Sequence, residues 1–204
     1  MREISRKPFH PTLLLGASRQ THLVAGAILV ASVLLAGCGG PQSSGRTTAT
    51  IRGWVLVEPP RQGFVVEMPN EPTATSADKE VPGGTLERTV YETQDEDGRI
   101  EYYLIRTVYP KGTFAGSYTR AQALSDLRRE FVDDRNGGEV ERTWFMKMKQ
   151  ADEATMFIFR TEGDVLWRVR QAIRGEVAYQ IAYATPDKAL RKTGARYLRS
   201  FELY

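Results

Sequence analysis

The chain has 204 residues and carries 28 Lys and Arg against 25 Asp and Glu, with two histidines and one cysteine. Both histidines, His10 and His22, precede Cys38, so residues 39–204 contain neither an imidazole nor a thiol. This composition excludes from residues 39–204 a Ser-His-Asp or Cys-His nucleophilic site, the usual Cys and His ligands of zinc, and an internal disulfide. We therefore expect no metal, no cofactor and no enzymatic activity there.

The first predicted element is an apolar segment, Leu23–Gly37, that ends on the only cysteine of the chain. It is shorter than the roughly 20 apolar residues that a membrane-spanning helix needs. One acidic residue and four basic residues precede it, and the basic residues are Arg2, Arg6, Lys7 and Arg19. A basic start followed by a short apolar segment is typical of a secretory signal.

The end of this segment, Leu35-Ala36-Gly37-Cys38, resembles a bacterial lipobox. In that motif small residues before an obligatory cysteine allow lipid transfer to the thiol and cleavage just before it. The resemblance predicts a signal peptide over residues 1–37 and a lipid anchor on Cys38, with the protein on the extracytoplasmic side of a bacterial envelope. Two or more acyl chains give stable attachment to the membrane. The alternative is an uncleaved signal anchor with an incidental cysteine.

Residues 38–50 are predicted to form the lipidated cysteine and a flexible tether, because they are rich in Gly, Ser and Thr. Residues 1–37 hold four of the 28 basic and one of the 25 acidic residues, so their removal leaves 24 of each kind. A neutral chain lacks the positive footprint of a nucleic-acid-binding protein, so we expect no nucleic-acid partner. Residues 51–204 are long enough for a single globular domain.

Alternating polarity and turn residues predict the N-terminal part of this domain. The predicted elements are two short strands within residues 51–69, separated by Pro59-Pro60, a surface loop over 70–84, and hairpin arms at Thr85–Glu92 and Arg99–Tyr109. Asp97-Gly98 supplies the turn between the two arms, since Gly adopts a positive φ without strain.

A helix is predicted over Thr119–Arg135, where apolar residues recur at helical spacing. Thr119 and Gln122 fit a capping box, and Asn136-Gly137-Gly138 is typical of a helix end. Four strands are predicted next, at Glu141–Lys149, Ala154–Thr161, Val165–Arg174 and Val177–Tyr183. Their short connections favour antiparallel hairpins.

A second helix is expected to begin at Thr185-Pro186-Asp187, with Pro at the first helical position. Its predicted inward stripe is Leu190, Gly194, Tyr197, Leu198 and Phe201. Together these elements predict an α+β domain, in which an antiparallel β-sheet of about six to seven strands packs with two main helices.

Two segments of this domain resemble a known family. Gly63-Phe64-Val65-Val66-Glu67-Met68-Pro69 resembles the opening motif of PsbP-like bacterial lipoproteins and their uncharacterised relatives, and Ala195–Leu203 resembles their closing helix and final strand. The resemblance implies a PsbP-like layered sandwich and an accessory or interaction role. Its motifs are core-forming, so it implies no catalytic residue.

Three arginines, Arg168, Arg170 and Arg174, are the candidate surface site, because strand alternation places them on one side of a strand. Apolar residues occupy the other side: Trp167, Val169 and Ile173. The functional interpretation is a patch that binds an anion, a phospholipid headgroup or a partner. The simpler interpretation is cross-strand ion pairing with Glu162 or Glu176 on a solvated face.

Three functions stay open. The leading hypothesis is a non-catalytic lipoprotein that binds an envelope protein partner or supports an envelope complex. The first alternative is a carrier of small ligands or lipids with a pocket between sheet and helices. The weaker alternative is a carboxylate-dependent hydrolase that uses acid pairs such as Glu139 and Glu141. Aromatic residues are expected in the core, and any that stay exposed would indicate a partner site.

Overall fold

The computed structural model describes residues 47–51, 53–81 and 83–204, the first of these ranges by its backbone. The chain divides into two units, Met1–Gln42 and Ser43–Tyr204, and all described residues belong to the second. The predicted signal peptide, Cys38 and most of the predicted tether lie outside the described residues. No helix in the described ranges is long and apolar enough to cross a membrane.

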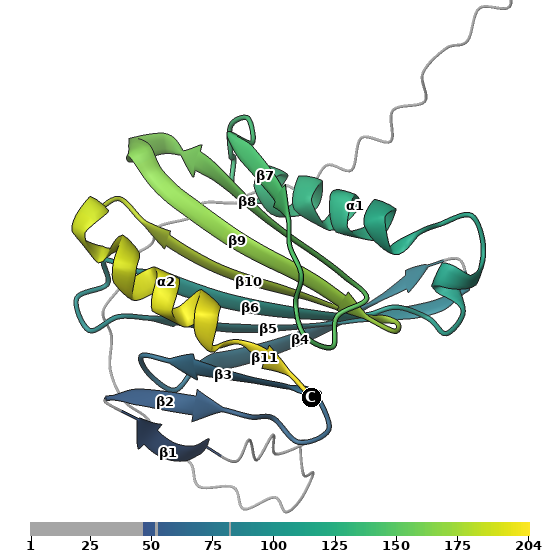
Figure 1. The fold of residues 1–204 in the computed structure, drawn as a ribbon, viewed down its shortest axis with the longest axis horizontal. Coiled ribbons are helices and arrows are strands. Elements are labelled where there is room, and N and C mark those ends of the chain that lie inside the picture. The colour runs from purple at the N-terminus through teal and green to yellow at the C-terminus, as the bar shows by residue number, and fades with distance from the viewer. Residues whose placement is uncertain (1–46, 52, 82) are drawn as a thin grey trace, which may run out of the picture. The chain divides into compact units, whose positions relative to one another are not determined.

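A seven-stranded antiparallel sheet forms the centre of the second unit (Figure 1). Its strands, in spatial order, are β4 (Thr73–Val81), β5 (Gly84–Gln94), β6 (Glu101–Val108), β10 (Val177–Thr185), β9 (Val165–Arg174), β8 (Glu153–Thr161) and β7 (Arg142–Phe145). Strands that follow one another along the chain pair as hairpins, except β6 and β7, which are separated by the helical segment that contains α1 (Arg120–Asp133). The pairing of β6 with β10 joins the two halves of the sheet.

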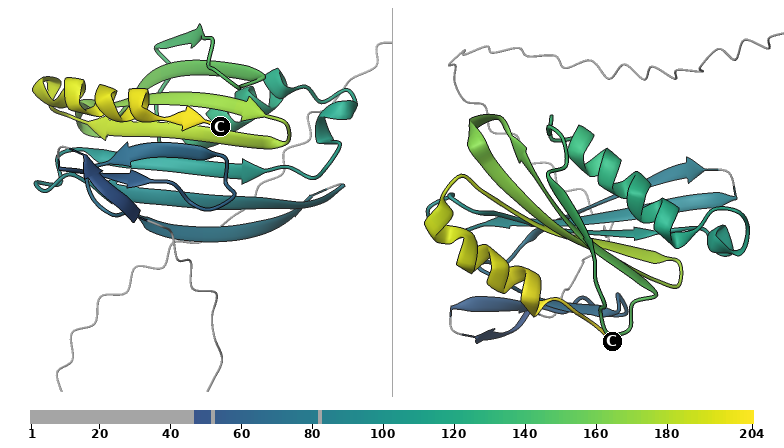
Figure 2. Two further views of the ribbon diagram at one scale, coloured as in Figure 1. Left: turned by 60° about the horizontal axis from the view of Figure 1, so that its bottom comes forward. Right: turned by 45° about the horizontal axis from the view of Figure 1, so that its top comes forward.

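A smaller, four-stranded sheet packs beside the large one. Its strands, in spatial order, are β1 (Thr47–Ile51), β2 (Trp54–Val57), β3 (Phe64–Met68) and β11 (Glu202–Leu203). The last strand comes from the C-terminal end of the chain and pairs antiparallel with β3. Figure 2 shows how the second long helix leads directly into this strand.

Two α-helices cover the large sheet, α1 (Arg120–Asp133) and α2 (Arg191–Ser200). Short 3₁₀ turns accompany them at Thr113–Ala115, Glu162–Asp164 and Lys188–Leu190. The predicted capping box is present, because the Thr119 hydroxyl accepts the amide of Gln122 while the Gln122 side chain accepts the amide of Thr119. These reciprocal bonds satisfy amides that have no partner inside the helix.

The two faces of the large sheet bury different cores. On one face α1 contributes Leu124, Leu127 and Phe131, which pack on residues of β8, β9 and β10. On the other face α2 and the small sheet cover Tyr102, Tyr183 and other residues of β6 and β10. The α+β prediction, with a large antiparallel sheet and two helices, is therefore confirmed.

Gly194 allows α2 to lie close to the sheet. A Cβ atom at this position would lie 2.6 Å from Cγ of Tyr183, a fully buried ring on β10. Gly194→Ala should therefore destabilise the protein, since overpacking costs about 1–3 kcal/mol and outweighs the roughly 1 kcal/mol by which alanine favours a helix. Chemical denaturation measures the change. Thr193→Ala, at an exposed position of the same helix, is the control and should leave stability unchanged or raise it slightly. If Gly194→Ala behaves like this control, the close packing of α2 is contradicted.

Three predicted elements differ from the structure. The segment 70–84, predicted as a loop, contains strand β4, which is exposed along its length and forms because it pairs with β5. The strand predicted at Glu141–Lys149 is limited to β7. The second helix begins at Arg191 after a 3₁₀ turn, and Pro186 lies before both, so proline does not occupy the first helical position. In addition, β1 begins at Thr47, within the segment predicted as a tether.

Candidate functional site

The candidate site lies on the face of the large sheet that also carries α2. Directly paired residues of antiparallel strands share a face, so the register identifies the side chains there. Two rows cross β7, β8 and β9 on this face: Arg142, Ile158 and Arg168, then Trp144, Met156 and Arg170. Both rows continue into residues of β10, Tyr183 and Ile181, that α2 helps to bury.

Helix α2 brings two further arginines to this face, Arg191 in its first turn and Arg199 in its last. The Tyr183 hydroxyl donates to the backbone oxygen of Arg191 over 3.4 Å. Burial raises the pKa of Tyr183, and the nearby charges of Arg168 and Arg191 oppose that rise. We refer to the resulting cluster as the arginine face, which consists of Arg142, Arg168, Arg170, Arg191 and Arg199.

The arginine face is cationic, and among the described residues no neighbouring side chain forms an ion pair that would neutralise its charges. Within residues 47–51, 53–81 and 83–204, none of its five members forms an ion pair. Buried nitrogens of three members also lack a hydrogen-bond partner there: Nε of Arg168, Nε of Arg170, and Nε and Nη2 of Arg191. Burial, followed by the charge of Arg199, lowers the pKa of Arg170.

These features make the arginine face suited to binding an anion. A buried donor without an acceptor costs about 1–3 kcal/mol, and clustered like charges repel one another. A carboxylate or phosphate group would accept hydrogen bonds from the guanidinium groups and offset their charge.

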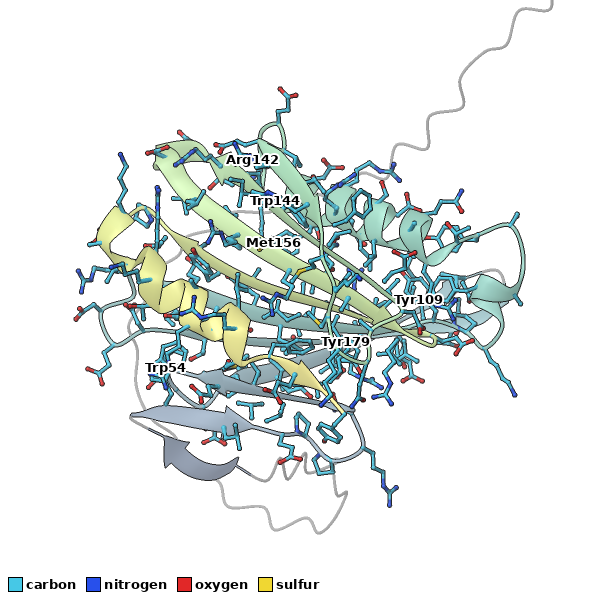
Figure 3. The ribbon with its side chains drawn as sticks, viewed as in Figure 1. Trp54, Tyr109, Arg142, Trp144, Met156 and Tyr179 are labelled. Atoms are coloured by element: carbon cyan, nitrogen blue, oxygen red, sulfur yellow. The ribbon has the colours of Figure 1, made fainter. Side chains whose placement is uncertain are left out.

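The arginine face has an apolar floor as well as charge. Met156 and Ile158 are half-buried between β7 and β9. At the margin of the face, Cζ of Arg142 lies 5.5 Å from the ring centroid of Trp144, a cation–π contact. Figure 3 shows Arg142, Trp144 and Met156 next to one another across β7 and β8. An acidic ligand with some apolar surface would match this combination.

The structure separates the three arginines that the sequence grouped. Arg168 and Arg170 belong to the arginine face, whereas the exposed Arg174 lies at the far end of β9 and donates to the backbone oxygen of Tyr204. In the described part of the chain, neither Arg168 nor Arg170 forms the ion pair with Glu162 or Glu176 that the simpler interpretation expects. Both residues are half-buried rather than fully solvated, and Nε of each is buried.

Sequence reasoning missed Arg191 and Arg199 because they belong to a helix that is distant from β9 in the sequence. A signal was present, since both lie beside the inward stripe of α2 and about two helical turns apart. It could be used only once α2 was known to pack next to β9. Arg142 was missed because β7 was predicted without its register against β8.

Two open clefts lie away from the arginine face. One, of about 660 Å³, is lined by Leu86, Tyr109, Lys111 and Tyr118 among others, and is a place where a small ligand could bind. The other, of about 500 Å³, contains Arg135, whose Cζ lies 3.6 Å from the ring centroid of Phe131.

The acid pair considered for hydrolysis does not form a cleft, since Glu141 pairs with Arg160 at 2.7 Å and Glu139 is exposed. Over the described ranges, no group of three or more His, Cys, Asp or Glu residues is placed to hold a metal ion.

The fold is similar to that of a known protein. The solution structure of cyanobacterial PsbP (CyanoP) from Synechocystis sp. PCC 6803 matches with a TM-score of 0.50 at 14% sequence identity, over 83% of this chain and 99% of that chain. This likeness confirms the PsbP-like fold that the sequence predicted. The crystal structure of PA94 from Pseudomonas aeruginosa, a protein of unknown function, matches with a TM-score of 0.33 at 10% identity, over 66% of this chain and 85% of that chain. No protein-family model and no curated protein matches the chain.

Proposed function

We propose that this chain is a lipid-anchored, non-catalytic protein of the bacterial envelope, whose PsbP-like domain binds an acidic protein partner through the arginine face. The single observation that supports the binding role is the group of five arginines without an ion-pair partner among the described residues. The lipobox-like segment that ends at Cys38 supports the anchor and the extracytoplasmic location.

The anchor and the arginine face act together in this proposal. Lipidation of Cys38 confines the domain to the membrane surface, where its effective concentration toward an envelope partner is high. A cationic face then increases the rate of encounter with an acidic partner and selects against basic ones. Because exposed charges are screened by salt, the association should weaken as ionic strength rises.

Charge reversal of the arginine face tests the proposal. Arg168→Glu/Arg170→Glu should abolish crosslinking of the lipidated protein to its partner in the native envelope, because two central charges change sign. Arg99→Glu/Arg129→Glu makes the same change in net charge at two exposed arginines that already pair with Asp97 and Asp126. This control should retain the crosslink, and thermal melting should show that both variants fold. Equal crosslinking by the two variants would contradict the proposed function.

A further inference from the structure

Strand β7 is an open edge of the large sheet. It pairs with β8 on one side, and no described residue pairs with it on the other. An edge strand presents unpaired backbone N–H and C=O groups, which can accept an additional strand from another chain. Such a pairing also places alternate side chains of the added strand next to those of the edge strand.

The side chains of β7 give its two faces different chemistry. Phe145 is 85% exposed, and Tyr204 is the only other large hydrophobic residue that is exposed in the described ranges. The opposite face of β7 carries Arg142 and Trp144, which belong to or border the arginine face. An added strand would therefore meet a cation on one face of the sheet and an exposed aromatic ring on the other.

The other edge of the same sheet is protected. Strand β4 is exposed on both faces, and its residues are small, polar or charged, with Asp78, Lys79 and Glu80 near its end. Charged residues on an edge strand discourage pairing with other chains. Strand β7 has no acidic residue and exposes a phenylalanine instead. The charges of β4 therefore discourage pairing with another chain, whereas β7 favours it.

We propose that β7 is the docking strand for the acidic partner, and that an extended segment of that partner pairs with it along its open edge. The segment places a carboxylate beside Arg142 and an apolar side chain beside Phe145. This inference rests on the proposed function, since both assume a protein partner, but it concerns a separate contact. Neighbouring strands lie roughly 5 Å apart, so an added strand would lie roughly 15 Å from β9, beyond direct contact with Arg168.

Charge favours this occupant over a second copy of the chain. If two copies paired antiparallel through β7 with their sheets continuous, two arginine faces would lie side by side. Like charges placed together oppose association. An acidic segment has the complementary charge.

A synthetic peptide tests the pairing. The probe has about eight residues with alternating Glu and Val, long enough to span a short strand, and is added to the full-length protein in a neutral detergent. Hydrogen exchange of the backbone amides is followed by mass spectrometry. We expect slower exchange at residues 142–145 when the peptide is present, and no change at β4.

Three comparisons make the result specific to strand pairing. A peptide of the same sequence with an N-methyl group at every residue has no N–H donor on either edge, so it cannot form the ladder and should give no protection. Phe145→Ser should lower the affinity for the peptide roughly fivefold, since a cross-strand contact contributes up to about 1 kcal/mol. Arg142→Glu should lower this affinity roughly tenfold through charge repulsion. The Phe145 variant should fold, because its side chain is exposed.

Several results would overturn the inference. The N-methylated peptide could give equal protection, or a peptide of glutamates only could bind equally well. Glycerol phosphate at the same charge concentration could displace the peptide. Light scattering could also show a β7-dependent dimer in the absence of peptide. The double variant Arg168→Glu/Arg170→Glu should bind the peptide more strongly than Arg142→Glu does. If the peptide does not pair with β7 but the envelope crosslink depends on Arg168 and Arg170, only the docking strand is refuted. If the peptide pairs with β7 but the crosslink does not depend on Arg168 and Arg170, only the role of the arginine face is refuted.

Discussion

Leu198→Ala should lower the free energy of unfolding by about 2–5 kcal/mol, because it removes a large apolar side chain from a packed core. Leu198 is 2% exposed and belongs to the cluster in which α2, the small sheet and the large sheet meet. A domain of this size is typically stable by roughly 5–15 kcal/mol, so the loss is a large fraction of the total. The melting temperature should fall by roughly 4–20 °C.

Calorimetry or circular dichroism measures this change. Lys192→Ala is the matched control, because Lys192 lies on the exposed side of the same helix and its replacement removes no buried contact. An unchanged melting curve for Leu198→Ala would show that α2 is not part of the core. It would also remove the support that α2 provides for Arg191 and Arg199.

Cys38→Ala should eliminate fatty-acid labelling of the protein and leave an uncleaved precursor. Cys38 is the only thiol of the chain and ends the segment that resembles a lipobox, so no other side chain can replace it in thioether formation. The loss should be complete rather than partial. Labelled palmitate in cells, followed by electrophoresis, reports both the label and the size of the chain.

Gly40→Ala is a suitable control for this experiment, because it lies after the proposed cleavage site and keeps the cysteine. It should be labelled and processed like the original protein. If the Cys38→Ala protein is still labelled and has the mature size, the proposed anchor is wrong, although the arginine face could still bind a partner.

The elements with strong local signals could be predicted from the sequence. Strand β9 has the predicted bounds because its apolar and polar residues alternate between two clear turns. Helix α1 combines a capping box with apolar residues at helical spacing and a glycine pair after its end. In each case the local preferences agree with the tertiary contacts, so local reasoning was sufficient.

Other elements depend on contacts between distant segments. Strand β4 has no apolar alternation, and only its pairing with β5 makes it a strand. Strand β11 has two residues, too few for any pattern, and its existence follows from β3. The small sheet as a separate layer therefore could not be predicted from periodicity.

The candidate site could be predicted only in part, because some of its residues are brought together by contacts between distant segments. Alternation along β9 was enough to place Arg168 and Arg170 on one face, but it also suggested Arg174, which lies at the end of β9 and donates to the backbone oxygen of Tyr204. The contribution of α2 and β7 to the arginine face required the packing of the whole domain. A surface assembled from three elements leaves no compact signature in the sequence.

The position of β11 has a consequence for the order in which the protein folds. Ser200 accepts a hydrogen bond from the backbone amide of Glu67, 133 residues earlier, and Phe201 and Leu203 are buried. The small sheet therefore cannot be completed until residues 202–203 have been synthesised and can reach β3. Until then Phe64, Val66 and Met68, which become fully buried, lack part of their cover. Contacts between segments so far apart in the sequence form slowly, so we expect the small sheet to be completed late in folding.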